Sequence, residues 1–118
     1  MYLINILMIE DLLKNADEFL ESGKDNLSKK RFNAAVSNFF KAIVILCDYL
    51  VYRDMKIIPK NHNERFSILE KYFKEIYTKV SELFQTYTAS YNLRLEEKDA
   101  NKLKNYAYEL KNSILDKK

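Results

Sequence analysis

The chain has 118 residues and a formal net charge of +3, from 20 basic and 17 acidic side chains. A domain of this length can bury roughly two thirds of the surface that its unfolded chain exposes, so residues 1–118 are expected to form a single domain with a real core. The small positive charge permits weak attraction to nucleic acid but does not indicate a nucleic-acid-binding protein. One glycine and one proline exclude a turn-rich fold, so the elements must be long.

The first predicted element is a long helix, because apolar residues recur every three or four positions from Leu3 to Leu27. Gly23 lies on this stripe, where we expect it to let another backbone approach closely; the alternative is a helix break at residues 22–23. The N-terminal segment MYLINILMI is apolar but ends at Glu10 and carries no basic region. It therefore predicts neither a signal peptide nor a membrane span.

A second apolar stripe predicts a helix from about Phe32 to about Met55, joined to the first by a short polar link. Alanines interleaved among phenylalanines favour close packing, so the two helices are expected to form an αα-hairpin. Cys47 lies in the apolar run AIVILCDYL. A single cysteine cannot form an internal disulfide, and we interpret it as a buried residue in a reducing compartment, which favours a cytoplasmic location.

Pro59 disfavours helix at the residue before it and so ends the second element. Asn61 is a strong N-cap residue, and Glu64 three positions later can complete a capping box. This loop is therefore expected to start a third helix.

The remaining stripes complete the predicted fold. One runs over residues 66–91, which is long for a compact domain, so a kink or short break is expected near residues 77–78. The last stripe begins with acidic residues and ends with lysines, which suits the helix dipole and predicts a helix over residues 97–116. No alternating strand pattern occurs. The sequence thus predicts an all-α, antiparallel up-and-down bundle of four to five helices.

The only histidine, His62, falls in the first turn of the third predicted helix, where the helix dipole disfavours its charged form. As a catalyst it would need a second group oriented towards it. Asp48 and Tyr52 are expected to gather with His62 and Arg65 around one end of the bundle, either as ligand-binding residues or as a polar capping network. With no second histidine and no cysteine pair, we predict no catalytic residue, no metal site and no cofactor.

A second candidate group is YTASYNLR, residues 87–94, where the spacing of Tyr87, Tyr91 and Arg94 places them on one helix face. Tyrosines beside an arginine could stack on and clamp a nucleotide. In the alternative, both tyrosines continue the core stripe and Arg94 packs over a ring. The chain has no glycine-rich phosphate loop and no paired-acid motif, so the sequence shows no residues of the kind that catalyse phosphoryl transfer.

Read in order, the chain resembles the HEPN superfamily, small helical bundles often encoded beside minimal nucleotidyltransferases in toxin–antitoxin-like pairs. The matching segments are FLESGKDNLSKKRFNAAVSNFFKAIVILCDYLV (19–51), IIPKNHNERFSILEKYF (57–73) and YTASYNLR (87–94). His62 resembles the family's loop histidine that opens the third helix. Nuclease members are similar in carrying an arginine followed four to six residues later by a histidine, but here Arg94 is followed at those positions by Lys98, Asp99 and Ala100.

The resemblance therefore implies a non-catalytic HEPN-like module that works by association. Its expected partners are a second copy of the chain, a minimal nucleotidyltransferase, and a nucleotide or RNA; no membrane is expected. The segment MYLINILMI is the candidate association patch, because the first helix starts before other helices can cover it. Two alternatives stay open: an endoribonuclease using Arg94, Arg65 or His62 in an atypical site, and a plain helical adaptor.

Overall fold

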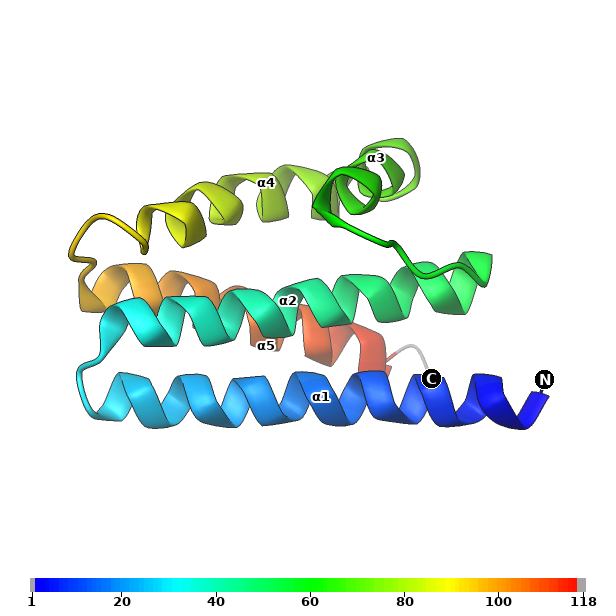
Figure 1. Cartoon of the computed structure of the whole chain (residues 1–118), viewed down its shortest axis with the longest axis horizontal. Helices are drawn as coiled ribbons and strands as arrows, with labels where there is room; N and C mark the ends of the chain where they lie inside the picture. Colours follow the sequence, from blue (N-terminus) through cyan, green and yellow to red (C-terminus); the bar gives the residue numbers. More distant parts are fainter. Residues whose placement is uncertain (1, 117–118) are drawn as a thin grey trace.

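A computed structural model describes the backbone of residues 2–116 and the side chains of residues 6–116 (Figure 1). This part of the chain contains no strand and five helices: α1 (Tyr2–Ser28), α2 (Phe32–Met55), α3 (His62–Tyr72), α4 (Lys74–Ala89) and α5 (Glu97–Asp116). The prediction of an all-α bundle is confirmed. The predicted bounds of the second and last helices match α2 and α5.

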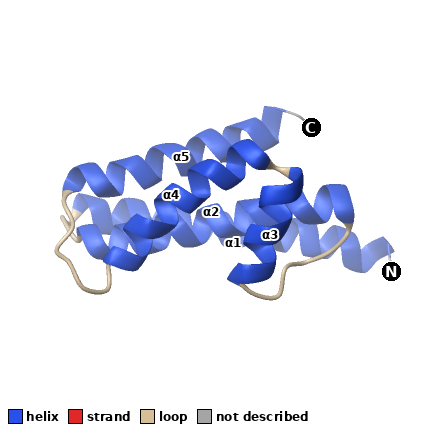
Figure 2. Ribbon diagram, turned by 90° about the horizontal axis from the view of Figure 1, so that it is seen from above, coloured by secondary structure: helices blue, strands red, loops and turns tan. Residues whose placement is uncertain are grey.

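Four of the helices run along the 44 Å long axis of the bundle, and successive ones point in opposite directions (Figure 1). α2 is central and packs against α1, α4 and α5. α3 is the exception, because it crosses the bundle at an angle before α4 begins (Figure 2). The start of α3 is thereby carried over the middle of α2.

α2 supplies most of the core, with thirteen buried residues that include Phe39, Phe40 and Cys47. By length and composition it is also the one helix in the described chain that could cross a membrane. However, 67% of its most apolar window is buried inside the bundle, as expected for a core helix. Its hydrophobicity is therefore accounted for by packing.

α1 is continuous through Gly23, so the predicted alternative of a break at residues 22–23 is wrong. The close approach at Gly23 is made by a side chain, and not by a backbone as expected. A Cβ atom at Gly23 would lie 2.5 Å from Cε1 of Phe39. The missing side chain of Gly23 thus leaves the space that the Phe39 ring occupies.

The break in the third stripe lies at Phe73, and not at residues 77–78 as predicted. Phe73 caps both helices: its N–H donates to the carbonyl of Leu69, and its carbonyl accepts from the N–H of Tyr77. Its side chain is partly buried against the core. Because the apolar spacing continues through Phe73 while the helix axis changes direction, periodicity alone could not locate the break.

The loop between α4 and α5 is tied to the start of α2 by one side chain. The amide nitrogen of Asn33 donates to the carbonyl of Ser90 at 2.8 Å and to that of Leu93 at 2.7 Å. Its amide oxygen accepts from the N–H of Leu95 at 3.0 Å. Three hydrogen bonds from one side chain hold this loop against the end of the bundle.

We predict that Gly23→Ala destabilises the protein even though alanine is the better helix former by about 1 kcal/mol. The new Cβ would overlap the Phe39 ring, and forcing atoms into a packed core typically costs about 1–3 kcal/mol. Urea unfolding followed by circular dichroism would measure the loss. Glu18→Ala, on the exposed face of α1, is the control and should not destabilise. Adding Phe39→Leu should recover part of the loss, and a stabilised Gly23→Ala would contradict the packing argument.

Candidate functional site

α3 is joined to α2 by a buried ion pair. The guanidinium of Arg65 contacts the carboxylate of Asp48 through two hydrogen bonds, Nε to Oδ1 at 2.7 Å and Nη2 to Oδ2 at 2.8 Å. Only about a tenth of each side chain is exposed. Asn61 sets up this geometry, because its side chain accepts from the N–H of Glu64 at 2.9 Å and so caps the start of α3. The predicted N-cap is confirmed.

His62 extends the ion pair towards solvent. Its Nδ1 lies 2.9 Å from Nη1 of Arg65, which can only donate, so Nδ1 is the acceptor and the neutral ring carries its proton on Nε2. The ring is tilted against Phe40 and Phe84, with centroid distances of 6.4 and 5.5 Å. Partial burial, together with the Arg65 guanidinium, lowers the pKa of His62 below its ordinary value of 6.5, although Asp48 acts in the opposite direction.

An aromatic cluster continues from His62 towards the end of α4. The ring of Tyr87 stacks on Phe40 with a centroid distance of 4.6 Å and an interplanar angle of 13°. The hydroxyls of Tyr87 and Tyr91 are 2.9 Å apart and share a hydrogen bond, which raises the pKa of Tyr87, as does its burial. Tyr91 itself is 75% exposed. The cluster thus joins a polar network at one end to an exposed phenol at the other.

A pocket of about 210 Å³ opens beside this cluster, and we call it the His62–Tyr87 pocket. Helices α1 to α4 all contribute to its lining: Phe19, Phe40, Lys41, Val44, Ile45, His62 and Tyr87. Lys41 is the one charged residue of this set. Its ammonium lies over the ring of Phe19, 5.6 Å from the centroid, and forms no ion pair with the described side chains. The pocket is therefore apolar and aromatic inside, with a cation at its rim.

The structure brings together five of the seven predicted site residues, in two groups bridged by Phe40 and Phe84: Asp48, His62 and Arg65 in one, and Tyr87 and Tyr91 in the other. Tyr52 is buried on α2, with the ammonium of Lys56 5.5 Å from its ring centroid. Arg94 is exposed in the loop that precedes α5.

The prediction that Tyr87, Tyr91 and Arg94 share one helix face is wrong, because α4 ends at Ala89. Tyr91 and Arg94 belong to the following loop, and no hydrogen bond or cation–π contact joins Arg94 to either tyrosine in the part of the chain that is described. The loop turns away here because Asn33 captures its backbone. The two tyrosines still meet through their hydroxyls.

Sequence reasoning missed Phe40 and Lys41 as site residues. Phe40 lies on the core stripe and was interpreted only as core, although it also forms the floor of the pocket. Lys41 carried a usable signal: it is the only charged residue between Phe32 and Cys47, in a helix that is otherwise mostly buried. A lone cation in such a helix marks a face that no other helix covers.

Metal and thiol chemistry find no support among residues 6–116. No group of three or more histidine, cysteine, aspartate or glutamate side chains is placed to hold a metal ion there. Cys47 is fully buried, and burial raises the pKa of its thiol to about 12. The thiol is therefore protonated near neutral pH and inert as a nucleophile.

No family model, curated protein or solved structure matches this chain.

Because His62 is the only histidine, its ring protons give an isolated signal in a proton NMR titration. We predict a pKa below 6.5 in the wild type, and a higher pKa in Arg65→Met, which removes the neighbouring positive charge. Lys60→Met, which removes an exposed positive charge just before α3, is the matched control and should change the His62 pKa far less.

The same lowered pKa has a consequence for stability. The folded state binds the His62 proton less tightly than the unfolded chain, so this residue has no effect on stability above pH 6.5 and reduces stability as the pH falls from 6.5 towards the folded pKa. His62→Asn should remove that part of the pH dependence. A wild-type pKa at or above 6.5 would show that the Arg65 contact is absent in solution.

Proposed function

We propose that this protein is a non-catalytic, HEPN-like helical module that binds a nucleotide in the His62–Tyr87 pocket and acts by association. The observation that carries the proposal is the pocket itself: an aromatic interior with one unpaired cation, Lys41, at its rim. A planar base can stack on exposed faces of aromatic rings, and an ammonium can pair with a phosphate. The pocket thus offers one group for each half of a nucleotide.

The state of the polar residues supports binding over catalysis. Both oxygens of the Asp48 carboxylate accept hydrogen bonds from Arg65. His62 uses Nδ1 as an acceptor, which leaves Nε2–H to donate a hydrogen bond and leaves no basic nitrogen facing a substrate. Arg94, which the endoribonuclease alternative would use, lies in the α4–α5 loop outside this network.

Isothermal titration calorimetry with adenosine 5′-monophosphate tests the nucleotide site. Lys41→Gln should weaken its binding about tenfold while leaving the binding of adenosine unchanged, because only the phosphate needs the ammonium. Tyr87→Leu should weaken both ligands about tenfold, through lost stacking. Lys14→Gln, an exposed lysine on α1, is the matched control. No binding at millimolar nucleotide, or equal effects of Lys41→Gln and Lys14→Gln, would contradict the proposal.

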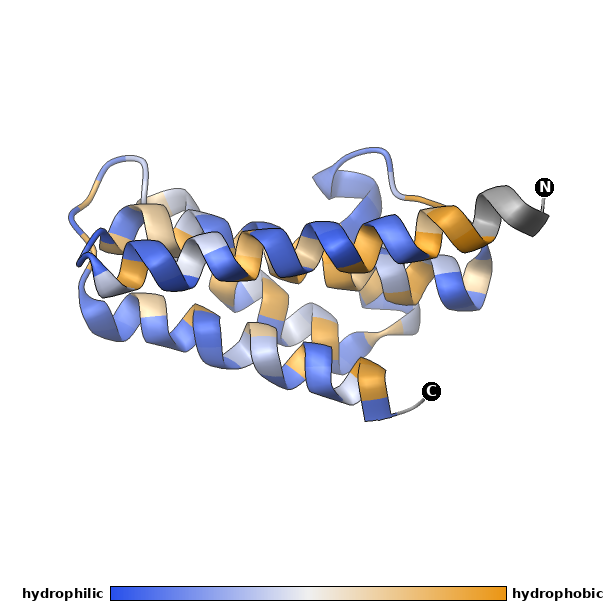
Figure 3. Cartoon of the chain, turned by 90° about the horizontal axis from the view of Figure 1, so that it is seen from below, coloured by the Kyte–Doolittle hydropathy of each residue, from blue (hydrophilic) through white to orange (hydrophobic). Residues whose placement is uncertain are grey.

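Association is proposed to use the end of the bundle where α1 begins and α2 and α5 end. Four exposed apolar residues lie in the segments that meet there, and we call this region the apolar end: Leu7, Ile57, Ile58 and Leu115. Figure 3 shows the apolar residues of α1 gathered towards its N-terminus. Side chains of residues 1–5, part of the expected association patch, lie outside the described residues.

A second copy of the chain is the proposed occupant of the apolar end, since symmetric dimers are the commonest way to cover such a surface. The HEPN resemblance adds a minimal nucleotidyltransferase as a further proposed partner. Binding of either partner would use the same property, the apolar surface that is exposed to water when the chain is alone.

We predict a dimer in size-exclusion chromatography with light scattering, and a monomer for Leu7→Glu. Leu7 is 50% exposed, so the change introduces a charge at the proposed interface without entering the core. Leu93→Glu is the matched control, because Leu93 is even more exposed but lies at the opposite end of the bundle, and it should remain dimeric. A monomeric wild type, or equal dissociation of both variants, would remove the apolar end as an interface.

A further inference from the structure

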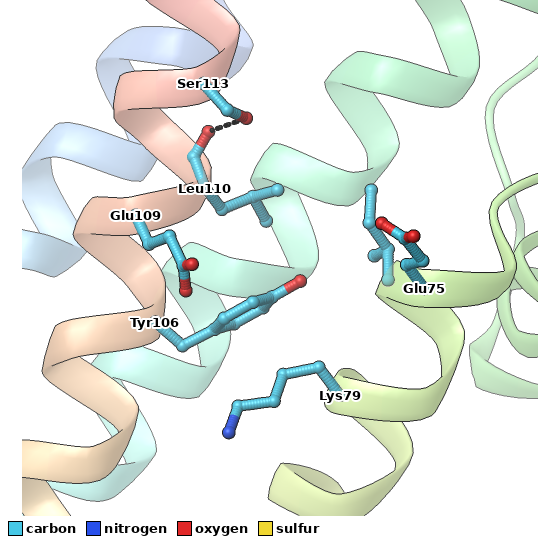
Figure 4. Close-up of a pocket in the computed structure, with 7 residues that line it drawn as sticks. Glu75, Lys79, Tyr106, Glu109, Leu110 and Ser113 are labelled. Carbon is cyan, nitrogen blue, oxygen red and sulfur yellow. Dashed lines mark hydrogen bonds between the residues drawn. The ribbon is translucent and has the colours of Figure 1, made fainter.

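A second, larger cavity of about 550 Å³ lies between α4 and α5 and takes no part in the proposed nucleotide site. Its lining consists of Glu75, Ile76 and Lys79 from α4 and Tyr106, Glu109, Leu110 and Ser113 from α5 (Figure 4). The two helices are bridged nearby, where Nζ of Lys102 lies 3.0 Å from Oε1 of Glu82. The cavity lies further along the two helices, towards the start of α4 and the end of α5.

The charged groups of this cavity form no ion pairs with one another, while the hydroxyl of Ser113 is engaged by donating to the carbonyl of Leu110 at 3.0 Å. Glu75 and Glu109 come from different helices, and neither forms an ion pair with the described side chains. Lys79 is the single cation, and its Nζ lies 4.0 Å from Oε2 of Glu82, outside the cavity lining. Figure 4 shows its ammonium directed away from Glu75. The cavity therefore keeps a net negative character.

Tyr106 gives the cavity a neutral polar group. Its hydroxyl points across the open space towards the helix that carries Glu75 (Figure 4). No hydrogen bond engages this hydroxyl in the described structure. Burial, with smaller contributions from Cys47 and Glu109, raises the pKa of Tyr106, so the phenol stays protonated and can accept or donate a hydrogen bond.

Apolar groups complete the lining. Leu110 is buried and Ile76 half-buried, so the inner wall can cover a hydrocarbon stem while the carboxylates face a charged head. A phosphate or carboxylate ligand is disfavoured here by the two glutamates. A metal ion is disfavoured by the apolar wall and by having only two carboxylates, one on each side.

We propose that the α4–α5 cavity binds an organic cation, a guanidinium or primary ammonium on an apolar stem, between Glu75, Glu109 and the hydroxyl of Tyr106. The cation can come from a small free amine or from a lysine or arginine side chain of a protein partner. In either case the stem lies on Ile76 and Leu110, and the head makes charge-assisted hydrogen bonds to the carboxylates.

The test is an NMR titration of the ¹⁵N-labelled full chain with agmatine, a guanidinium on a four-carbon stem. Chemical-shift changes are expected on residues 75–79 and 106–113, and pentan-1-ol, which has a similar stem but no charge, should bind more weakly. Glu75→Gln and Glu109→Gln should each weaken agmatine binding about fivefold, and Tyr106→Phe should also weaken it. All three side chains are at least partly exposed, so the variants are expected to fold.

Glu18→Gln, an exposed glutamate on α1, is the matched control and should bind agmatine like the wild type. The blocked peptide acetyl-Gly-Arg-Gly-amide separates the two sources: tighter binding than agmatine identifies a protein side chain, and weaker binding identifies a free amine. Shift changes spread over all acidic surfaces, or equal effects of Glu18→Gln and Glu75→Gln, would overturn the proposal. Because the mapped residues are outside the His62–Tyr87 pocket, this result is independent of nucleotide binding.

Discussion

The ion pair between Arg65 and Asp48 determines where α3 lies, and the candidate site depends on that position. α3 has eleven residues; it fully buries Arg65 and Leu69 and packs Phe66 and Ile68 partly against the core. A bidentate pair fixes distance and rotation together, because both nitrogens must meet both oxygens. An apolar pair of similar volume could stabilise the fold as well or better, but it would not impose this register. His62 owes its place over Phe40 to that register.

The parts of the fold that the sequence predicted best are those determined by a single local pattern, either an apolar stripe or a helix cap. The bounds of α2 and α5 follow from uninterrupted apolar stripes with clear polar ends, and the start of α3 follows from the N-cap Asn61. The break at Phe73 was misplaced because two helices that pack on the same neighbour can share one continuous stripe. The path of residues 90–96 depends on Asn33, which is 57 to 62 residues away in sequence. Hydrogen bonds between residues so far apart in the chain produce no local sequence pattern, so the path of this loop could not be predicted.

The same distinction separates the predicted site residues from the missed ones. Asp48, His62 and Arg65 are joined as three of the four residues that were expected to gather at one end of the bundle, but they meet over the middle of α2 and not at its end. The sequence indicated that the three are near in the chain, but not how far back along α2 the loop carries the start of α3. Phe40 and Lys41 belong to the site only because α1, α3 and α4 leave one face of α2 partly uncovered. That gap is a product of how α3 crosses the bundle, which no helical period encodes (Figure 2). Lys41 was the only sequence-level sign of it.

The two cavities have opposite preferences for charge, and this limits what a single ligand can do. α4 contributes to both: Tyr87 near its end lines the His62–Tyr87 pocket, and Glu75 near its start lines the α4–α5 cavity. In the proposed roles, a nucleotide phosphate pairs with Lys41 and is disfavoured beside Glu75 and Glu109. The two proposals thus differ in the charge of the ligand, and a partner that engaged both sites would present an anion and a cation on different parts of its surface.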